Sequence, residues 1–373
     1  MAAATSNLND AFLTAETNFG LNMLEKLPAS HSAVLSPVSV IFALAMVQAG
    51  ARGKTKTEIN EIISKGANDD EIENFYSGLS KDILNAGNGV KTRIANGFFL
   101  DKRYSIEDAY AATIKDKYSA EVKALDFSQF KEAAKTIDGF VSNATAGKIK
   151  DFVTQDTVKD AFSIIINAIY FTAEWEYPFY KSLTKNLTFF SSENDQKEIE
   201  FLRDSNERRL YAEDDDMEVL SLRYKDTSYA FNIFLPKERF ALEKLRKKLI
   251  GDAIQKLLSK LELTYMSLSI PKMKIETDLN LKDALMAMGV NEMFSDSADL
   301  TGITASPPLK VTKANHKAII EVDEKGTTAA AATSFKIEPR SRKPDPAVKF
   351  IANHPFIFIL TKNNNPLFIG HFA

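Results

Sequence analysis

Apolar residues in the first sixty positions recur at the spacing of helices. Residues 12–24 are apolar at intervals of three or four, which predicts an amphipathic helix. The next segment, SPVSVIFALAMVQAGARGKTKTEI, opens with Ser36 and Pro37, a pair typical of a helix start. Residues 38–48 are apolar on most faces of a helix, so we predict that this helix is buried.

Later segments have the pattern of strands. Residues 92–101 and 162–175 are rich in β-branched and aromatic side chains and predict buried strands, with a helix over 130–149 between them. Further strand-like segments are VLSLRY, YAFNIFLP, MSLSIPKMKI, KANHKAIIEVDEKG and HPFIFILTKNNNPLFIGHF, with a helix predicted over 279–290. Helices precede strands without βαβ alternation, which predicts an α+β fold in a single domain over residues 1–373.

Composition and charge exclude several classes of protein. The chain has 47 Lys and Arg against 50 Asp and Glu, a net charge of −3, and nothing in this balance suggests a nucleic acid or an anionic membrane as partner. It has no cysteine, which excludes disulfides, thiol catalysis and cysteine-ligated zinc. No apolar run reaches the length of about eighteen residues that a membrane span needs.

Motifs of catalysis and of metal or cofactor binding are not found. The histidines are His31, His316, His354 and His371, and none has the spacing of a zinc site. There is no G-x-S-x-G turn and no phosphate-binding loop. A catalytic triad assembled in space stays open, but no local signature supports it. We therefore predict no metal, no cofactor and no enzymatic activity, and interpret residues 213–218 as an acidic turn and 243–249 as a helix with a basic face.

The segment EKGTTAAAATSF, residues 324–335, fits neither the helical nor the strand pattern. A helix here would have no apolar stripe to bury, although alanine favours helices. The basic, proline-rich segment KIEPRSRKPDP follows at once. Taken alone, the run is typical of a flexible linker or a short exposed helix. Together the two segments predict an exposed loop over residues 325–347.

Five segments, in order along essentially the whole chain, resemble motifs of the serpin family. They are the segment that begins at Ser36, TRIANGFFLDK, INAIYFTAEWEYPF, HKAIIEVDEKGTTAAAAT and HPFIFILTKNNNPLFIGHFA. The resemblance implies helices packed around three mainly antiparallel sheets, with an exposed reactive-centre loop. The chain departs from the family pattern at Asp138, Phe140, Thr172, Arg223 and His371, none of which lies in the loop.

The resemblance implies a suicide-substrate inhibitor of trypsin-like serine proteases, whose cleaved loop inserts into a sheet and traps the protease as a covalent complex. The family spacing from Glu324 places the reactive bond at Arg340–Ser341, and Arg342 is the alternative register. The implied hinge is Glu324, Lys325, Gly326, Thr327, Thr328, Ala329, Ala330, Ala331, Ala332 and Thr333, and the implied specificity flank is Glu338, Pro339, Arg342 and Lys343. Trp175 and Asn167 are expected to pack where the loop enters the sheet.

The small side chains suit insertion on physical grounds. Successive strand residues face opposite sides, so Thr327, Ala329, Ala331 and Thr333 would share one face, and Thr328, Ala330, Ala332 and Ser334 the other. Because interiors are close-packed, both faces of an inserting strand need small residues. Gly326 offers the backbone freedom that a hinge requires.

Other functions and locations stay open at this point. The alternatives are an inhibitor of a cysteine protease, a non-inhibitory serpin acting as a carrier or chaperone, and, more remotely, a hydrolase. We expect a monomer. Glycosylation acceptor patterns at Asn143 and Asn186 favour the extracellular space. The first twenty residues lack signal-peptide features, so a cytoplasmic location is the alternative.

Overall fold

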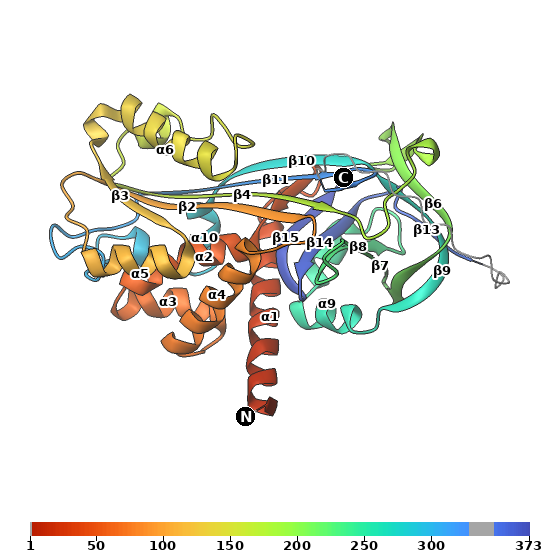
Figure 1. The fold of residues 1–373 in the computed structure, drawn as a ribbon, viewed down its shortest axis with the longest axis horizontal. Coiled ribbons are helices and arrows are strands. Elements are labelled where there is room, and N and C mark those ends of the chain that lie inside the picture. The colour runs from red at the N-terminus through yellow and green to blue at the C-terminus, as the bar shows by residue number, and fades with distance from the viewer. Residues whose placement is uncertain (1, 328–346) are drawn as a thin grey trace.

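The computed structural model describes residues 2–327 and 347–373, which fold into helices packed against two sheets (Figure 1). In Figure 1 a long sheet crosses the molecule, with α6 above it and α2 to α5 below. The helices are α1 (Ala2–Glu25), α2 (Pro37–Gly50), α3 (Gly53–Ser64), α4 (Asp69–Leu84), α5 (Asp108–Tyr118), α6 (Phe130–Ala144), α7 (Gln155–Val158), α8 (Leu242–Lys248), α9 (Gly251–Leu258) and α10 (Leu281–Ala287), with 3-10 turns η1 (Phe127–Gln129), η2 (Lys181–Leu183) and η3 (Glu292–Phe294).

The long sheet has six strands in the order β10-β11-β12-β4-β2-β3. These are β10 (Met273–Asn280), β11 (Lys313–Val322), β12 (Gly326–Thr327), β4 (Ser163–Glu174), β2 (Val90–Asp101) and β3 (Glu121–Leu125). Strands β4 and β11 run parallel, and so do β2 and β3, whereas the other pairs are antiparallel. The parallel pair β4–β11 lies near the middle of the sheet and becomes the centre of the functional site.

The second sheet has nine strands in the order β1-β15-β14-β8-β7-β6-β9-β13, with β5 paired to β6. These are β1 (Ala33–Leu35), β15 (Asn365–Phe372), β14 (Phe356–Lys362), β8 (Tyr229–Pro236), β7 (Met217–Arg223), β6 (Gln196–Glu213), β9 (Glu262–Pro271), β13 (Val348–Ile351) and β5 (Lys185–Phe190). The implied second and third sheets are continuous here, because the 18-residue β6 pairs with β5 at one end and with β7 at the other.

The predicted helix start at Ser36 and the α+β class are confirmed. Ser36 caps α2, its side chain accepts a hydrogen bond from the Ser39 N–H, and Pro37 is the first helical residue. Nearly all of α2 is buried, as its uniform apolarity predicted. The strand-like segment 266–275 is confirmed and contributes to two strands, since Lys272 separates β9 from β10. Strand β6 was missed because its sequence is largely polar and lacks an apolar run.

The long sheet separates two hydrophobic cores. On one face, Ile137 and Val141 of α6 pack with Ile164 and Ile166 of β4. On the other face, the main core joins α2 and the nine-stranded sheet to residues such as Phe171. A new strand in the long sheet would therefore meet packed side chains on both faces. Within residues 2–327 and 347–373, no helix has the length and apolar content to cross a membrane.

Candidate functional site: the gap between two central strands

Strands β4 and β11 separate at one end, and β12 lies between them. Over most of its length β4 pairs directly with β11, from Lys313 with Ile164 to Ile319 with Tyr170. Beyond Tyr170 and Ile319, toward the C-terminal ends of both strands, Thr327 of β12 pairs with Ala173 of β4 and with Val322 of β11, antiparallel to both. The sheet thus already holds the first two residues of an additional strand, with its two neighbours parted to receive it.

A tight turn directs the chain from β11 into this gap. The carboxylate of Asp323 accepts hydrogen bonds from the backbone N–H groups of Lys325 (2.8 Å) and Gly326 (3.1 Å). Gly326 has a φ of 156°. A Cβ at this position would lie 1.9 Å from the carbonyl oxygen of Ala173. Only glycine therefore allows the backbone to approach β4 this closely.

Aromatic side chains form the floor of the gap. The Trp175 ring stacks on Tyr224, with 4.5 Å between ring centroids, and its Nε1–H donates to the Asp323 carbonyl at 2.9 Å. The Tyr224 hydroxyl lies 2.7 Å from the hydroxyl of Thr327, and both side chains are fully buried. The first inserted side chain is therefore held by a hydrogen bond inside an apolar pocket.

Glu324 fastens the turn to neighbouring loop segments. Its carboxylate accepts a hydrogen bond from the Thr184 hydroxyl at 3.0 Å and lies 3.4 Å from the ammonium of Lys272. Its backbone carbonyl accepts from the Phe179 N–H at 2.8 Å. Burial alone would raise the pKa of Glu324, but hydrogen bonds and the Lys272 charge lower it below its usual value. The carboxylate is therefore ionised at neutral pH and anchors the turn to Thr184 and Lys272.

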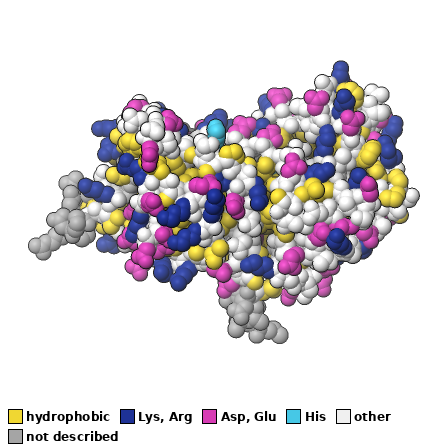
Figure 2. Space-filling model, turned by 180° about the vertical axis from the view of Figure 1, so that it is seen from behind, with side chains coloured by type: hydrophobic (Ala, Val, Ile, Leu, Met, Phe, Trp, Pro, Cys, Tyr) yellow, Lys and Arg dark blue, Asp and Glu magenta, His cyan; other side chains and the backbone are white. Residues whose placement is uncertain are grey.

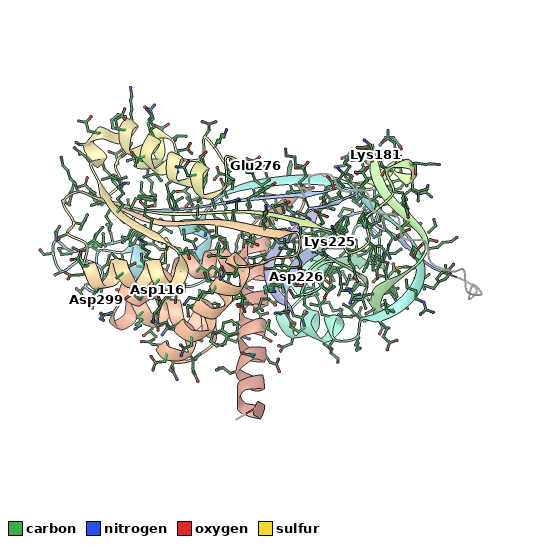
Figure 3. All side chains as sticks on the ribbon, viewed as in Figure 1. Asp116, Lys181, Lys225, Asp226, Glu276 and Asp299 are labelled. Carbon is green, nitrogen blue, oxygen red and sulfur yellow. The ribbon has the colours of Figure 1, made fainter. Side chains whose placement is uncertain are left out.

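Two ion pairs connect the end of β4 to the nine-stranded sheet. Arg223 forms a two-pronged contact with Glu176, at 2.8 Å from Nε and 3.3 Å from Nη2. Lys225 pairs with Glu174, which precedes Trp175 in the chain as Glu176 follows it. Figure 3 shows Lys225 and Lys181 in the half of the molecule that holds the nine-stranded sheet, whereas Asp116 and Asp299 lie at the opposite end. Arg223, a departure from the family pattern, thus has an acidic partner.

A buried polar cluster closes the gap further down. The Nδ1 of His316 on β11 lies 2.5 Å from Oδ1 of Asn167 on β4, and the Ser36 N–H donates to Nε2 at 3.1 Å. Since Nε2 accepts, Nδ1 carries the proton and the imidazole is neutral. Asn167 also donates to the Ser39 carbonyl at 3.0 Å. This cluster joins β4, β11 and α2 at the point where the direct β4–β11 pairing holds the sheet closed.

Protonation of His316 is expected to destabilise the fold. Burial lowers the pKa of His316 to about 3, although the hydrogen bond with Asn167 acts in the opposite direction. The unfolded chain therefore binds more protons than the folded chain between about pH 6.5 and pH 3. The contribution of His316 to stability is complete above about pH 6.5 and is lost as pH falls, by up to about 1.4 kcal/mol per pH unit.

Urea unfolding at several pH values, for the wild type and for His316→Gln, tests this expectation. His354 and His371, whose pKa values burial also lowers, add to the slope of both proteins. Below pH 6.5 we expect the slope of the unfolding free energy against pH to be smaller in the variant. The difference should correspond to the uptake of one proton. Equal slopes would mean that His316 binds its proton in the folded protein as readily as in the unfolded one.

The structure describes only part of the predicted site. Trp175 lies at the mouth of the gap, whereas Asn167 lies six residues from Ala173 along β4, roughly 20 Å at about 3.4 Å per strand residue. Gly326 and Thr327 were expected in an exposed loop, and this was wrong: both are buried, because β12 pairs on each side. The remaining hinge residues, 328–333, the reactive bond at 340–341 and the flank at 338, 339, 342 and 343 lie outside the described residues.

Sequence reasoning missed several residues of this site. Tyr224, Thr184 and Lys272 come from three separate segments and carry no motif of their own. His316 was considered only as a metal ligand, and its spacing excluded that role. Its place beside Asn167 follows from strand register, which the sequence alone does not show.

Comparison with known proteins agrees with this architecture. Residues 14–373 match the family model described as serpin, serine protease inhibitor. The chain is 31% identical to Iripin-2 of Ixodes ricinus, over 97% of this chain and 93% of that protein. The chain belongs to the serpin family. Its members are protease inhibitors rather than enzymes, with exceptions that do not inhibit.

Solved structures of other serpins have the same fold. Serpin48 of the insect Tenebrio molitor, described as highly specific, superposes with a TM-score of 0.87 at 26% identity, covering 96% of this chain and 97% of that one. Human thyroxine-binding globulin complexed with thyroxine superposes with a TM-score of 0.86 at 25% identity, covering 96% and 97%. The resemblance seen in the sequence is therefore confirmed for family and fold.

Two departures of this serpin from the family pattern are accommodated on α6. The Asp138 carboxylate accepts hydrogen bonds from the backbone N–H groups of residues 151, 152 and 153, at 3.2, 2.8 and 3.2 Å. Phe140 packs edge-on against Phe99, with 5.5 Å between ring centroids. Asp138 and Phe140 thus hold α6 over the sheet.

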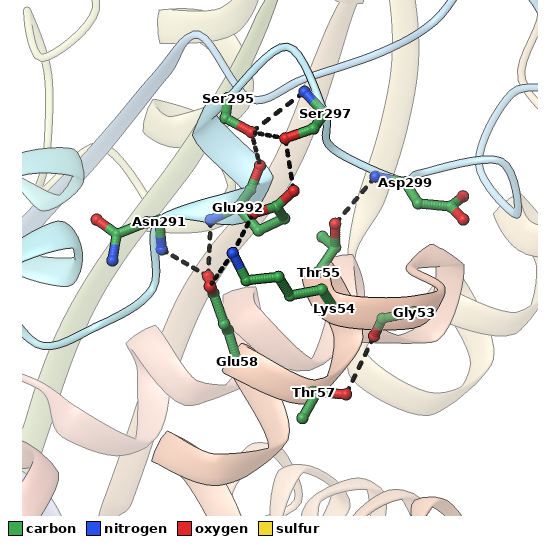
Figure 4. A network of polar contacts seen from close by, with 10 residues as sticks. All are labelled: Gly53, Lys54, Thr55, Thr57, Glu58, Asn291, Glu292, Ser295, Ser297 and Asp299. Atoms are coloured by element: carbon green, nitrogen blue, oxygen red, sulfur yellow. Dashed lines mark hydrogen bonds and ion pairs between the residues drawn. The ribbon is translucent and has the colours of Figure 1, made fainter.

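Another polar cluster of this serpin joins α3 to η3. Glu58 of α3 accepts hydrogen bonds from the backbone N–H groups of Asn291 and Glu292, and Lys54 pairs with Glu292 at 2.8 Å (Figure 4). This network fastens α3 to η3, away from the gap. Basic and acidic side chains are interspersed over the face in Figure 2. Among the described residues no group of His, Asp and Glu could hold a metal ion.

Proposed function

We propose that this serpin is a suicide-substrate inhibitor of trypsin-like serine proteases. The observation that carries the proposal is the position of β12, which is antiparallel to both neighbours and fills the parted end of β4 and β11. A loop cleaved beyond this point can continue the same strand without reversing direction. Its backbone N–H and C=O groups would then pair on both sides, which favours insertion.

The strand register supports the extent of insertion that the small residues suggest. Thr327 pairs with Ala173 and Val322, so continuing the same register brings residue 333 opposite both Asn167 and His316. These two residues are now paired with each other. Insertion through Thr333 therefore requires that the hydrogen bond between Asn167 and His316 breaks. Thr333 would then lie between these two residues.

The faces of the sheet support the need for small residues. Thr327 faces the main core through Tyr224, so Ala329, Ala331 and Thr333 would follow on that side, above residues such as Phe171. The alternate residues would face the core beneath α6. Bulky side chains at any of these positions would overpack one of the two cores.

The proposed chemistry places the bait at Arg340. An arginine side chain fits a protease pocket with a buried aspartate. The protease serine attacks the carbonyl carbon of Arg340, the peptide bond breaks, and the amino group of Ser341 leaves with one proton. The resulting ester joins the protease to the loop. Insertion then carries the protease along the sheet, away from the geometry that water needs to hydrolyse the ester.

Denaturing gels after mixing with trypsin test the proposal. We expect a stable band at the summed mass and a released peptide that begins at Ser341, with the band lost in Arg340→Ala. Arg342→Ala serves as the matched control, because it removes the same charge two residues away. A band lost only in Arg342→Ala would move the reactive bond, and cleavage with no band in the wild type would contradict inhibition of trypsin-like enzymes.

Two alternative functions predict other outcomes when the protein is mixed with a protease. A cysteine protease that accepts arginine would form a thioester complex instead. A carrier role, for which the thyroxine complex of thyroxine-binding globulin is a precedent within the fold, predicts cleavage without a complex. The parted strands and the small hinge residues favour inhibition over this role.

We further propose a single-domain, monomeric, extracellular protein, with a cytoplasmic location as the alternative. Asn143 and Asn186 are both exposed, which suits glycosylation in a secretory pathway.

A further inference from the structure

The outward residues of β6, β9 and β13 form a solvent-facing surface. Cross-strand pairing places them in rows: Arg203–Ser269–Ile351, Ser205–Ser267–Lys349, Arg208–Tyr265 and Leu210–Leu263. We call these residues the outer sheet face. The residues on the opposite side, such as Met266, Leu268 and Phe350, are buried. The sheet is therefore covered on one side and open on the other.

The outer sheet face is basic. It contains Arg203, Arg208 and Lys349, and none of its positions carries Asp or Glu. Among the described residues neither Arg208 nor Lys349 forms an ion pair. The neighbouring Arg209, which points to the other side, is paired with Asp204. The outer sheet face thus presents two basic side chains, Arg208 and Lys349, that have no ion-pair partner among the described residues.

The same face exposes apolar side chains on a rigid support. Leu263 is 60% exposed and Ile351 is 45% exposed, although both lie within strands. Tyr265 is two residues from Leu263 on the same side of β9 and pairs across the strands with Arg208. Aromatic residues and arginine are enriched at protein interfaces, whose buried centres are apolar. Charge and apolar area together indicate a protein partner with carboxylates near an apolar patch.

The partner's identity follows from the position of β13. This strand begins at Val348, eight residues after Arg340, which is at most about 28 Å of extended chain. A protease whose pocket holds Arg340 must therefore lie within reach of the outer sheet face. Figure 1 shows β6, β9 and β13 together at one end of the molecule.

We propose that the outer sheet face is a second contact surface for the target protease, selecting trypsin-like enzymes that are acidic beside their cleft. This inference rests on the proposed function. Positive charge near the bait attracts such enzymes before the pocket is filled, which raises the association rate more than the final affinity. Salt screens the attraction.

The test compares two trypsins that share the same pocket, one with an acidic surface and one with a basic surface. The variant Arg208→Gln/Lys349→Gln removes two charges from the face. Lys81→Gln/Lys115→Gln removes two exposed charges from α4 and α5 and serves as the matched control. The association rate constant and the stoichiometry of inhibition are measured at about 0.05 M and about 0.5 M salt.

We expect the face variant to react roughly tenfold more slowly with the acidic trypsin at low salt, with unchanged stoichiometry and no difference at high salt. The control variant should stay near the wild-type rate. Equal slowing of both variants would mean that only net charge matters, and no slowing would overturn the proposal. Acceleration of the wild type by heparin, lost in the face variant, would identify the face as a polyanion site instead.

Failure of the proposed function gives a different result. The wild type would then form no denaturant-stable complex with either trypsin, so no association rate could be altered. A covalent complex that forms at the same rate in all variants would leave the proposed function intact and overturn only the role of the outer sheet face.

Discussion

Thr327→Arg is expected to convert this serpin from an inhibitor of trypsin into a substrate. Thr327 is 0% exposed, and its hydroxyl lies 2.7 Å from that of Tyr224. An arginine here would place a charge and a long side chain against the stacked rings of Trp175 and Tyr224, and the contacts of Thr327 with the described residues include no carboxylate that could pair with it. Because Thr327 is already buried before cleavage, the substitution is expected to expel β12 from the gap in the native state. Insertion of the cleaved loop would then have to bury an unpaired charge, which costs several kcal/mol, about enough to block it.

The measurement is the stoichiometry of inhibition, read as moles of serpin consumed per mole of trypsin inactivated. We expect it to rise more than about tenfold in Thr327→Arg, since a free-energy change of about 1.4 kcal/mol already shifts a partition tenfold. Cleavage after Arg340 should continue at a normal rate, because the bait is unchanged. The cleaved variant should also lack the gain in thermal stability that insertion gives.

Thr327→Val is the matched control for this substitution. It keeps the shape of threonine and removes only the hydrogen bond with Tyr224, for an expected loss of about 1 kcal/mol. We expect this variant to inhibit with nearly the wild-type stoichiometry. One-to-one inhibition by Thr327→Arg would show that the strand enters the sheet without burying the side chain of residue 327, and would contradict the insertion register described above.

Glu16→Leu is expected to stabilise the native fold by several kcal/mol at neutral pH. Glu16 is 0% exposed in the middle of α1, and neither carboxylate oxygen has a hydrogen-bond partner among the described residues. Burial raises the pKa of Glu16 well above its usual value. Leucine has a similar volume and removes a polar group whose unpaired burial costs roughly 1 to 3 kcal/mol even when it is neutral.

The gain from Glu16→Leu depends on pH in a defined direction. The raised pKa means that the folded protein holds a proton which the unfolded chain releases above about pH 4.3. The contribution of Glu16 to the unfolding free energy of the wild type is therefore most favourable below about pH 4.3. It falls as pH rises, by up to about 1.4 kcal/mol per pH unit. We expect the variant to gain more at pH 8 than at pH 5.

Urea unfolding of the wild type, Glu16→Leu and Glu16→Gln at these two pH values measures both effects. Glu16→Gln removes the ionisation but keeps a polar group, so it should abolish the pH dependence and recover only part of the stability. Equal stability of wild type and Glu16→Leu at pH 8 would mean that the carboxylate has partners when ionised. The two pH effects oppose each other, since His316 destabilises the fold on the acid side and Glu16 on the alkaline side.

Local patterns were enough to predict much of the fold. Ser36 and Pro37 marked the start of α2, and the apolar residues 162–175 marked β4, because capping and side-chain periodicity act over a few residues. Polar strands such as β6 were not predictable, because their stability comes from neighbours on either side rather than from their own apolar residues.

By itself, the sequence determined many of the elements of this serpin, its family, and the run of small residues that suits an inserting strand. Only the tertiary structure decided that Gly326 and Thr327 already lie in the sheet, and that Tyr224, Asn167 and His316 line the path ahead of them. It also decided that Arg208, Tyr265 and Lys349 share one open face. Periodicity and side-chain size are local properties, whereas strand order and register join residues more than a hundred positions apart.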